Sequence, residues 1–178
     1  MPLKDLLFSF DGRIRRRDWW MWGLGIGIAW GVVLAAVGGV LFGVSFRTSL
    51  LGGPELPHSW TFTAYSLVTF LPMLWVQAAL AAKRAHDRNH GARISVGLTA
   101  LGGLASFAPE VVDLVTNASL TDSQFNAVYV ATNVGIFAIH FYLLITQGVL
   151  DGTPGPNRFG PSPKAAEQPA FREPGETA

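Results

Sequence analysis

Four long stretches of this 178-residue chain contain no lysine, arginine, aspartate or glutamate. Charged residues make up only 14% of the sequence, whereas a soluble domain carries about 25%. A helix needs about 20 apolar residues to cross a bilayer, and three of the stretches are long enough while one is short. The chain is therefore predicted to be an all-α, polytopic membrane protein with four transmembrane helices. The stretches are Trp19–Phe46, Trp60–Ala82, Ile94–Ala108 and Ser123–Leu150.

Basic residues gather in alternate connections between these stretches. They precede the first stretch, separate the second from the third and follow the fourth. The remaining two connections hold Arg47 as their only lysine or arginine, and one of them carries Glu110, Asp113 and Asp122. Because lysine and arginine collect on the cytoplasmic flanks of membrane helices, both termini are expected in the cytoplasm.

The whole chain up to residue 163 is expected to form a single domain. Residues 1–18 would be a cytoplasmic approach segment and residues 152–163 a cytoplasmic end segment. Residues 164–178 are rich in proline, alanine and glutamate, a composition typical of a disordered tail.

The third stretch is the shortest of the four. As a helix, Ile94–Ala108 would be only roughly 22 Å long, which is less than the hydrocarbon thickness of a bilayer. We expect it to span with Val111–Val115 as an extension, because this places the tail with the other cytoplasmic charges. The alternative is a re-entrant or interfacial segment.

Small residues recur at every fourth position of the first stretch. Such residues let two helix backbones approach closely in lipid, where packing replaces the missing hydrophobic drive. A row with this spacing wraps around the helix, so packing against the other helices of the same chain is favoured. A homodimer seam or a contact with another protein is the alternative. The row consists of Gly23, Gly27, Gly31, Ala35, Gly39 and Gly43.

The densest polar cluster is Lys83–His90, and it mimics a zinc-binding motif. His86-Asp87-x-x-His90 resembles the H-E-x-x-H helix of metalloproteases, but aspartate is shorter than glutamate and the neighbouring cations oppose a metal ion. Asn89–Gly91 is typical of a helix end. A charged turn that faces lipid phosphates is therefore favoured over a membrane metalloenzyme. Without cysteine or a recognisable catalytic motif, the chain is predicted to be non-enzymatic and to need no cofactor.

Three polar residues inside the uncharged stretches are candidates for one group, namely Gln77, Asn133 and His140, and Gln147 is a further uncharged polar residue there. An ionisable residue within the membrane is a functional candidate by default, although a neutral histidine can simply donate a hydrogen bond to Gln77 or Tyr65 of a neighbouring helix. The structural role is favoured. The alternative is a small transporter or channel subunit that uses the three residues as a polar patch.

Three separated segments resemble one known family. They are Phe8–Trp20, Ala82–Arg88 and Gly152–Pro163. Their order and spacing are similar to the F-x-G-R-x-x-R-x-x-[FYW]-W, K-R-x-H-D and G-T-x-G-x-N-x-[FY]-G patterns of the domain-of-unknown-function 805 family. That family consists of small bacterial inner-membrane proteins, so the resemblance implies a multi-pass protein of the bacterial inner (plasma) membrane.

All three segments fall on the cytoplasmic side in the topology argued from charge, so we expect them to meet in one basic platform. Aspartates 11, 18 and 87 would pair with the arginines of the first two segments, and Asn157 and Arg158 would cap them. The platform would bind anionic lipid headgroups or a partner protein, and the alternative is that these charges only set the membrane topology; the short basic clusters do not favour nucleic acid. Its predicted members are Gly12, Arg13, Arg16, Arg17, Asp18, Arg84, His86, Asp87, Arg88, Gly152, Asn157 and Arg158.

Overall fold

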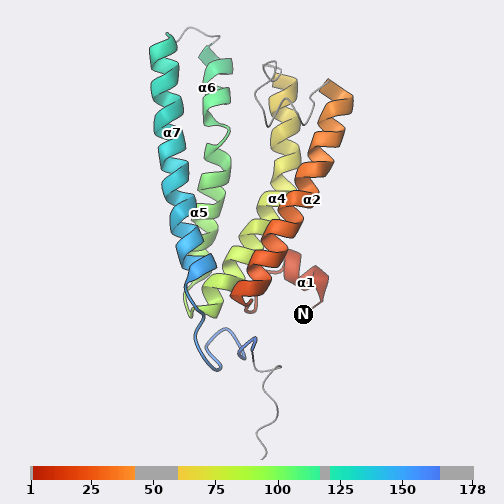
Figure 1. Ribbon diagram of the computed structural model, residues 1–178, viewed down its shortest axis with the longest axis vertical. Helices are drawn as coiled ribbons and strands as arrows, with labels where there is room; N and C mark the ends of the chain where they lie inside the picture. The colour runs from red at the N-terminus through yellow and green to blue at the C-terminus, as the bar shows by residue number, and fades with distance from the viewer. Residues whose placement is uncertain (1, 43–59, 117–120, 165–178) are drawn as a thin grey trace, which may run out of the picture.

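The computed structural model describes residues 2–42, 60–116 and 121–164, and the regular elements within these ranges are helical (Figure 1). Three helices are long and apolar enough to cross a membrane, and α5 is a shorter apolar helix. The predicted all-α fold with membrane-spanning helices is confirmed at this level. The predicted tail beyond Lys164, the loop after the first stretch and Gly43 lie outside the described residues. The elements are α1 (Leu3–Phe8), α2 (Arg16–Phe42), α4 (Trp60–Asp87), α5 (Ala92–Ala105), α6 (Ala108–Thr116), α7 (Asp122–Leu143) and the π-helical turn η1 (Leu144–Val149).

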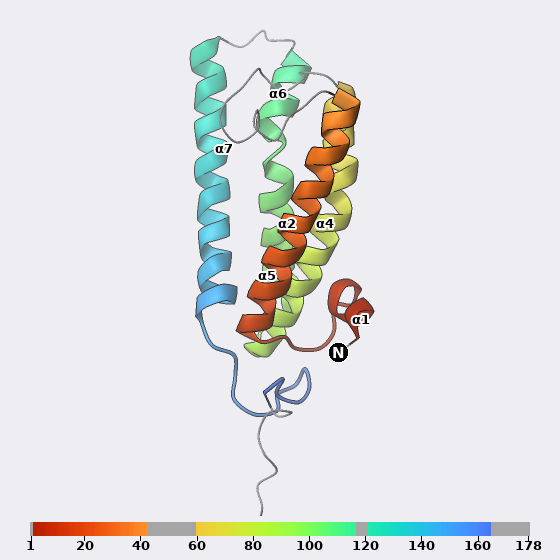
Figure 2. The same cartoon turned by 45° about the vertical axis from the view of Figure 1, so that its right-hand side comes forward.

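The helices pack in chain order. The α2 helix packs against α4, α4 against α5, and both α5 and α6 against α7. Figures 1 and 2 show the α2–α4 and α5–α7 pairs diverging from the end of the bundle where α1 lies. In the most apolar part of α2, only 6% of the residues are buried. The same fraction applies to the most apolar part of the span that α7 and η1 form together. These exposed apolar surfaces require an apolar solvent.

The third uncharged stretch and its expected extension form two helices, α5 and α6, which a turn separates. The α5 helix ends at Ala105, and the chain turns at Phe107, whose N–H donates to the Leu104 carbonyl over 3.1 Å. The α6 helix then continues along α7 (Figure 1). A methyl group built on Gly103 would lie 2.8 Å from the ring of Phe70. The glycine therefore permits α5 to approach α4 closely.

The row of small residues in α2 faces α4 at one end only. Methyl groups built on Gly23 and Gly27 would lie 3.8 and 3.6 Å from α4 side chains, whereas Gly31 has open space around it. Farther along, Gly38 is buried and would meet Tyr65, although it is not a member of the row. Ala35 and Gly39 are half-buried. The row wraps away from α4, as its spacing requires.

The most buried part of the molecule is the last third of α4. Five alanines there are buried, which brings the surrounding backbones close together. Leu80 is fully buried and forms a hydrophobic core with Val76, Leu6 of α1 and Ile14. The core therefore lies at one end of the bundle, beside the polar residues of the α4 terminus. The alanines are Ala78, Ala79, Ala81, Ala82 and Ala85.

Candidate functional site

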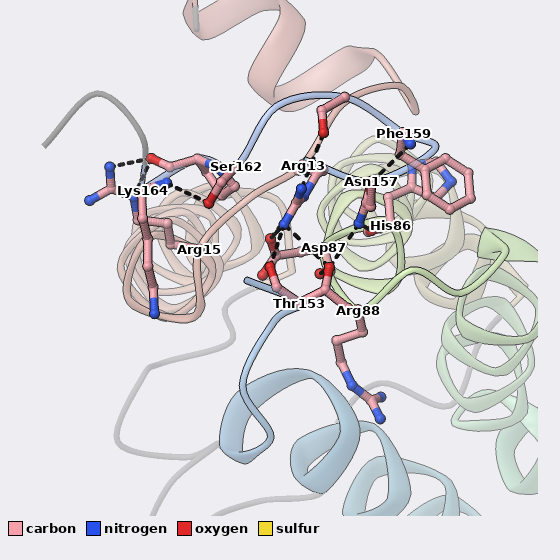
Figure 3. A network of polar contacts seen from close by, with 12 residues as sticks. Arg13, Arg15, His86, Asp87, Arg88, Thr153, Asn157, Phe159, Ser162 and Lys164 are labelled. Carbon is pink, nitrogen blue, oxygen red and sulfur yellow. Dashed lines mark hydrogen bonds and ion pairs between the residues drawn. The ribbon is translucent and has the colours of Figure 1, made fainter. Parts of the chain in front are cut away.

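The three motif segments meet around the carboxylate of Asp87, at the end of α4 (Figure 3). Arg13 donates from Nε and Nη2 to Oδ1 of Asp87 over 3.1 and 3.0 Å. Arg84 donates from Nη1 to the other oxygen, Oδ2. The exposed fractions of the side chains are 2% for Arg13, 0% for Arg84 and 6% for Asp87. We call these three residues the arginine–aspartate centre.

Backbone carbonyls complete the coordination of Arg13. Its Nη1 donates to the carbonyls of Gly155 and Gly160 over 2.8 and 3.2 Å, and its Nη2 donates to that of Thr153 over 2.8 Å. Two buried guanidinium groups exceed the single carboxylate by one positive charge. Buried ions are stable only when further hydrogen bonds satisfy their remaining donors, and the end segment supplies these acceptors.

Side chains from α2 and α4 satisfy the carbonyls at the end of η1. A helix end leaves its last carbonyls without intrahelical partners, and positive charge is favourable at this end of the helix dipole. Five successive carbonyls are capped here, so the last helix is held to the first two. Arg88 donates to Thr146 (3.0 Å), Arg84 to Gln147 (2.6 Å) and to Leu150, Trp20 to Gly148 (3.0 Å), and Arg16 to Val149 (2.8 Å).

The end segment also caps the C-terminus of α4. Thr153 donates from its backbone N–H and its hydroxyl to the carbonyl of Asp87 over 2.8 and 2.9 Å. The side-chain amide of Asn157 donates to the His86 carbonyl over 2.9 Å. The Phe159 ring stacks on the His86 ring, with centroids 3.9 Å apart (Figure 3). The sequence pattern predicted the place of this segment but not the contacts of Thr153 and Phe159.

Glycines are required where the end segment approaches the centre. A methyl group built on Gly152 would overlap Oδ2 of Asp87 and lie 2.5 Å from its carboxyl carbon. Gly155 and Gly160 have φ angles of 71° and 125°, and Gly12 has a φ of 93°. Residues other than glycine rarely adopt such positive φ angles. The glycines of the first and last motifs therefore have a steric explanation.

The ion pairs differ in part from those expected. Arg16 lies 3.4 Å from Asp151, which was not among the predicted partners. Arg88 binds a carbonyl and not Asp87. Arg17 lies 3.6 Å from Asp18, and both are more exposed than the centre. Arg158, expected as a cap, donates to the carbonyl of Asn89 over 3.2 Å and lies over the ring of Phe159.

Lys83 is fully buried although sequence reasoning did not place it in the platform. Its Nζ donates to the carbonyl of Leu6 over 3.0 Å and to that of Ser9, which ties α1 to α4. In the sequence, Lys83 is one of several basic residues in a predicted cytoplasmic cluster. Nothing in the charge pattern distinguishes a buried lysine from a solvated one.

The two histidines of the predicted zinc-like motif have different surroundings. Nδ1 of His86 lies 3.2 Å from the Gly12 carbonyl, whereas His90 is exposed beyond the end of α4, its Nδ1 lying 2.7 Å from the Arg88 carbonyl. Asn89 has a φ of 59°, which fits the predicted helix end. Within the described residues, no three histidine or carboxylate side chains are grouped in a way that could hold a metal ion.

The predicted intramembrane patch does not assemble as a group of three. Asn133 is exposed and donates to the Tyr129 carbonyl of its own helix over 2.8 Å. His140 contacts the Ile136 carbonyl of its own helix over 2.9 Å, and not Gln77 or Tyr65. The amide of Gln77 donates to Gly23 over 3.3 Å. Gln77 and His140 do line one apolar cavity of about 540 Å³, from which Asn133 is absent.

A second cavity lies beside the arginine–aspartate centre. Its volume is about 490 Å³, and Arg84 and Asp87 form part of its wall. Four further basic residues line it, together with the exposed Asp151: they are Arg15, Arg16, Arg17 and Lys164. Nε of Arg15 donates to the Pro163 carbonyl over 2.7 Å, which holds the end segment against the start of α2. We call this cavity the basic pocket.

Similarity to known proteins identifies the family of this chain, and neither the family description nor the names of the relatives state an activity. The uncharacterized protein YiiR of Escherichia coli strain K12 is 40% identical over 88 residues, which cover 49% of this chain and 47% of YiiR. YiiR of Escherichia coli O157:H7 gives the same values. The chain thus spans about half the length of the curated relatives it matches, and no solved structure matches it. The family described as "Protein of unknown function (DUF805)" matches residues 7–161, which hold the first two motifs and the third up to residue 161, and the chain belongs to this family.

Proposed function

We propose that this chain is a multi-pass protein of the bacterial inner membrane whose basic pocket binds the phosphate groups of anionic lipids. The observation that carries the proposal is the pocket itself, in which basic side chains outnumber carboxylates. It lies at the start of α2, where Trp19, Trp20 and Trp22 follow the arginines. Tryptophans prefer the membrane–water interface, so the pocket would lie at the depth of the lipid headgroups.

The proposed topology has four spans and cytoplasmic termini. Helices α2, α4 and α7 have the length of spans, and α5 with α6 runs along α7 (Figure 1). Both α1 and the end segment lie at the same end of the bundle (Figures 1 and 2), as an even number of spans requires. The basic connections at that end favour the cytoplasm.

Cysteine labelling in spheroplasts tests this topology, because the sequence contains no cysteine of its own. The exposed residues His90 and Ser123 are suitable positions. A membrane-impermeant maleimide added to spheroplasts should label the variant Ser123→Cys, and it should label His90→Cys only after the membrane is opened. Labelling of both variants without opening would contradict the four-span arrangement.

Burial divides the basic residues into two classes. Arg13, Lys83 and Arg84 are buried and donate to groups of the chain itself. The side chain of Arg17 is 71% exposed, and Lys164 is exposed as well. Only the second class can reach a lipid phosphate without breaking the centre. Each such charge contributes about 1 kcal/mol near an anionic surface, so the loss of two should weaken binding by about 30-fold.

Thermal unfolding of the purified full chain in detergent tests the lipid proposal. Added phosphatidylglycerol should stabilise the protein more than phosphatidylcholine does, because a ligand that binds the folded state stabilises it. The double variant Arg17→Gln/Lys164→Gln should lose this difference. The control Lys4→Gln/Arg93→Gln removes two exposed charges that do not line the pocket, and it should keep the difference.

Equal stabilisation of the natural chain by the two lipids would contradict the proposal. An equal loss in the two double variants would also contradict it, because the effect would then come from overall charge and not from the pocket. A protein that copurifies from native membranes, and whose binding the first double variant abolishes in phosphatidylcholine, would point to a partner protein instead.

A further inference from the structure

The cavity of about 540 Å³ inside the helix bundle has the character of a binding site for an apolar group. It is lined mainly by apolar side chains of α4 and α7, among them Phe70, Leu74 and Phe141, and α5 contributes Thr99 and Gly103. Trp19 and Gln147 form part of its wall from α2 and η1. Its volume falls in the range of about 300–1,000 Å³ that is usual for ligand pockets.

One buried hydrogen-bond donor in this wall lacks an acceptor. Gln147 is 3% exposed, and within the described residues its Nε2 has no hydrogen-bond partner. Buried polar groups are nearly always paired in native proteins, and each exception needs an explanation. The backbone of Gln147 is fixed, because Arg84 donates to its carbonyl over 2.6 Å. The side chain is also presented by a π-helical turn, an element that is frequent at functional sites.

Three other polar side chains of the cavity already donate to backbone carbonyls, and one of them is Thr99, whose hydroxyl donates to Ser95 over 2.8 Å. Nδ1 of His140 faces the Ile136 carbonyl at 2.9 Å, and because a carbonyl only accepts, this nitrogen carries the hydrogen. Nε2 of Gln77 donates to Gly23. An oxygen of a bound molecule would therefore find its donor at Gln147.

The depth of Gln147 indicates the class of molecule that can supply this oxygen. The next carbonyl, that of Gly148, accepts from the indole N–H of Trp20 over 3.0 Å, and interfacial tryptophans mark the headgroup level. Gln147 thus lies at the border between the apolar cavity and the polar end of the bundle. In a phospholipid, the ester carbonyls occupy the same border, between the headgroup and the acyl chains.

We propose that the cavity holds one acyl chain of a diacyl phospholipid, whose ester carbonyl accepts a hydrogen bond from Nε2 of Gln147. The chain occupies the apolar walls, and the ester supplies an acceptor without adding a buried donor. This site is separate from the basic pocket and does not depend on the charge of the headgroup.

Photo-crosslinking of the full chain in phosphatidylcholine nanodiscs tests the proposal. A phosphatidylcholine with a diazirine in one acyl chain serves as the probe, and labelled peptides are mapped by mass spectrometry. Cavity-lining residues of α4, α5 and α7 should be labelled in the natural chain. Gln147→Leu should reduce this labelling by about 2- to 10-fold, the effect of one hydrogen bond. The matched control Asn133→Leu removes an amide outside the cavity and should leave the labelling unchanged.

A second variant, Thr99→Phe, fills the cavity, because Thr99 lines its α5 wall. It should abolish labelling inside the cavity while the exposed face around Val134 is still labelled. Unfolding midpoints show that the compared variants are folded. Equal cavity labelling in Gln147→Leu and Asn133→Leu would overturn the proposal. So would a lipid-soluble molecule other than a phospholipid that copurifies and blocks labelling.

Discussion

The replacement Asp87→Asn tests whether the arginine–aspartate centre holds the fold together. The substitution keeps the size of the side chain but removes its charge. Arg13 and Arg84 then lie buried without a counter-ion, at exposed fractions of 2% and 0%. The new amide nitrogen also brings donor hydrogens toward two guanidinium groups that can only donate.

The expected decrease in the free energy of unfolding follows from these contacts. Removal of one partner of a buried ion pair destabilises a protein by about 3–5 kcal/mol. Here one carboxylate serves two buried arginines, so this range is a lower bound. The ratio of folded to unfolded protein should fall by at least a factor of about 10²–10⁴.

The matched control is Asp151→Asn, in the exposed ion pair that joins the residue before the end segment to the start of α2. Asp151 pairs with Arg16, and the two side chains are 69% and 47% exposed. An exposed pair contributes about 0–1 kcal/mol. Unfolding by dodecyl sulfate in mixed micelles, followed by tryptophan fluorescence, should separate the two variants by more than 2 kcal/mol (about the difference of the two ranges).

A double-mutant cycle with Arg13→Gln isolates the pair itself. Groups in direct contact show interaction energies of about 0.5–3 kcal/mol, and we expect a value in the upper half of that range. Unfolding free energies of Asp87→Asn and Asp151→Asn that agree within error would refute the reasoning. Strictly additive effects of Arg13→Gln and Asp87→Asn would refute it as well.

Two further predictions concern the approach of the end segment and of α1. The variant Gly152→Ala should destabilise the protein by about 1–3 kcal/mol in the same unfolding assay, because its methyl group overlaps the Asp87 carboxylate. Gly97→Ala, placed where a methyl group meets open space, is the control and should not destabilise; equal effects would contradict the steric argument. Lys83→Met should speed tryptic cleavage after Lys4, because Lys83 holds the carbonyls of Leu6 and Ser9 and so ties α1 to α4. The exposed control Arg93→Met should not, and unchanged cleavage in Lys83→Met would show that α1 is held by its apolar contacts alone.

The helices were predictable because lipid leaves few alternatives for an uncharged run of this length. In a bilayer, backbone groups must be satisfied within the segment, so helices were the expected structure for Trp19–Phe46 and Ser123–Leu150, where α2 and α7 lie. The break between α5 and α6 was not predictable in the same way. It falls at Ser106 and Phe107, inside the third uncharged stretch, and the one signal beside it is Pro109 in the first turn of α6, a position typical of a helix start.

The candidate site was predictable in place but not in detail. Motif order and charge brought Arg13, Asp87 and Asn157 to one end of the bundle. Burial is a property of the packed structure, so the sequence could not show that Lys83 is buried while Arg17 is exposed. Gln147 was noticed only as one uncharged polar residue among others, because its unpaired amide results from the packing of η1.

The distance along the chain between Arg13 and its acceptors has a consequence for biogenesis. Arg13 donates to the carbonyls of Thr153 and Gly160, which are 140 and 147 residues away. At roughly 5–20 residues per second of synthesis, the ribosome makes these acceptors many seconds after the arginine. Until then Asp87 is present but the carbonyl acceptors of the end segment are missing, so water must satisfy the remaining guanidinium hydrogens. A translation product that stops before the end segment would keep this polar end open to water, where a protease could recognise it as unfinished.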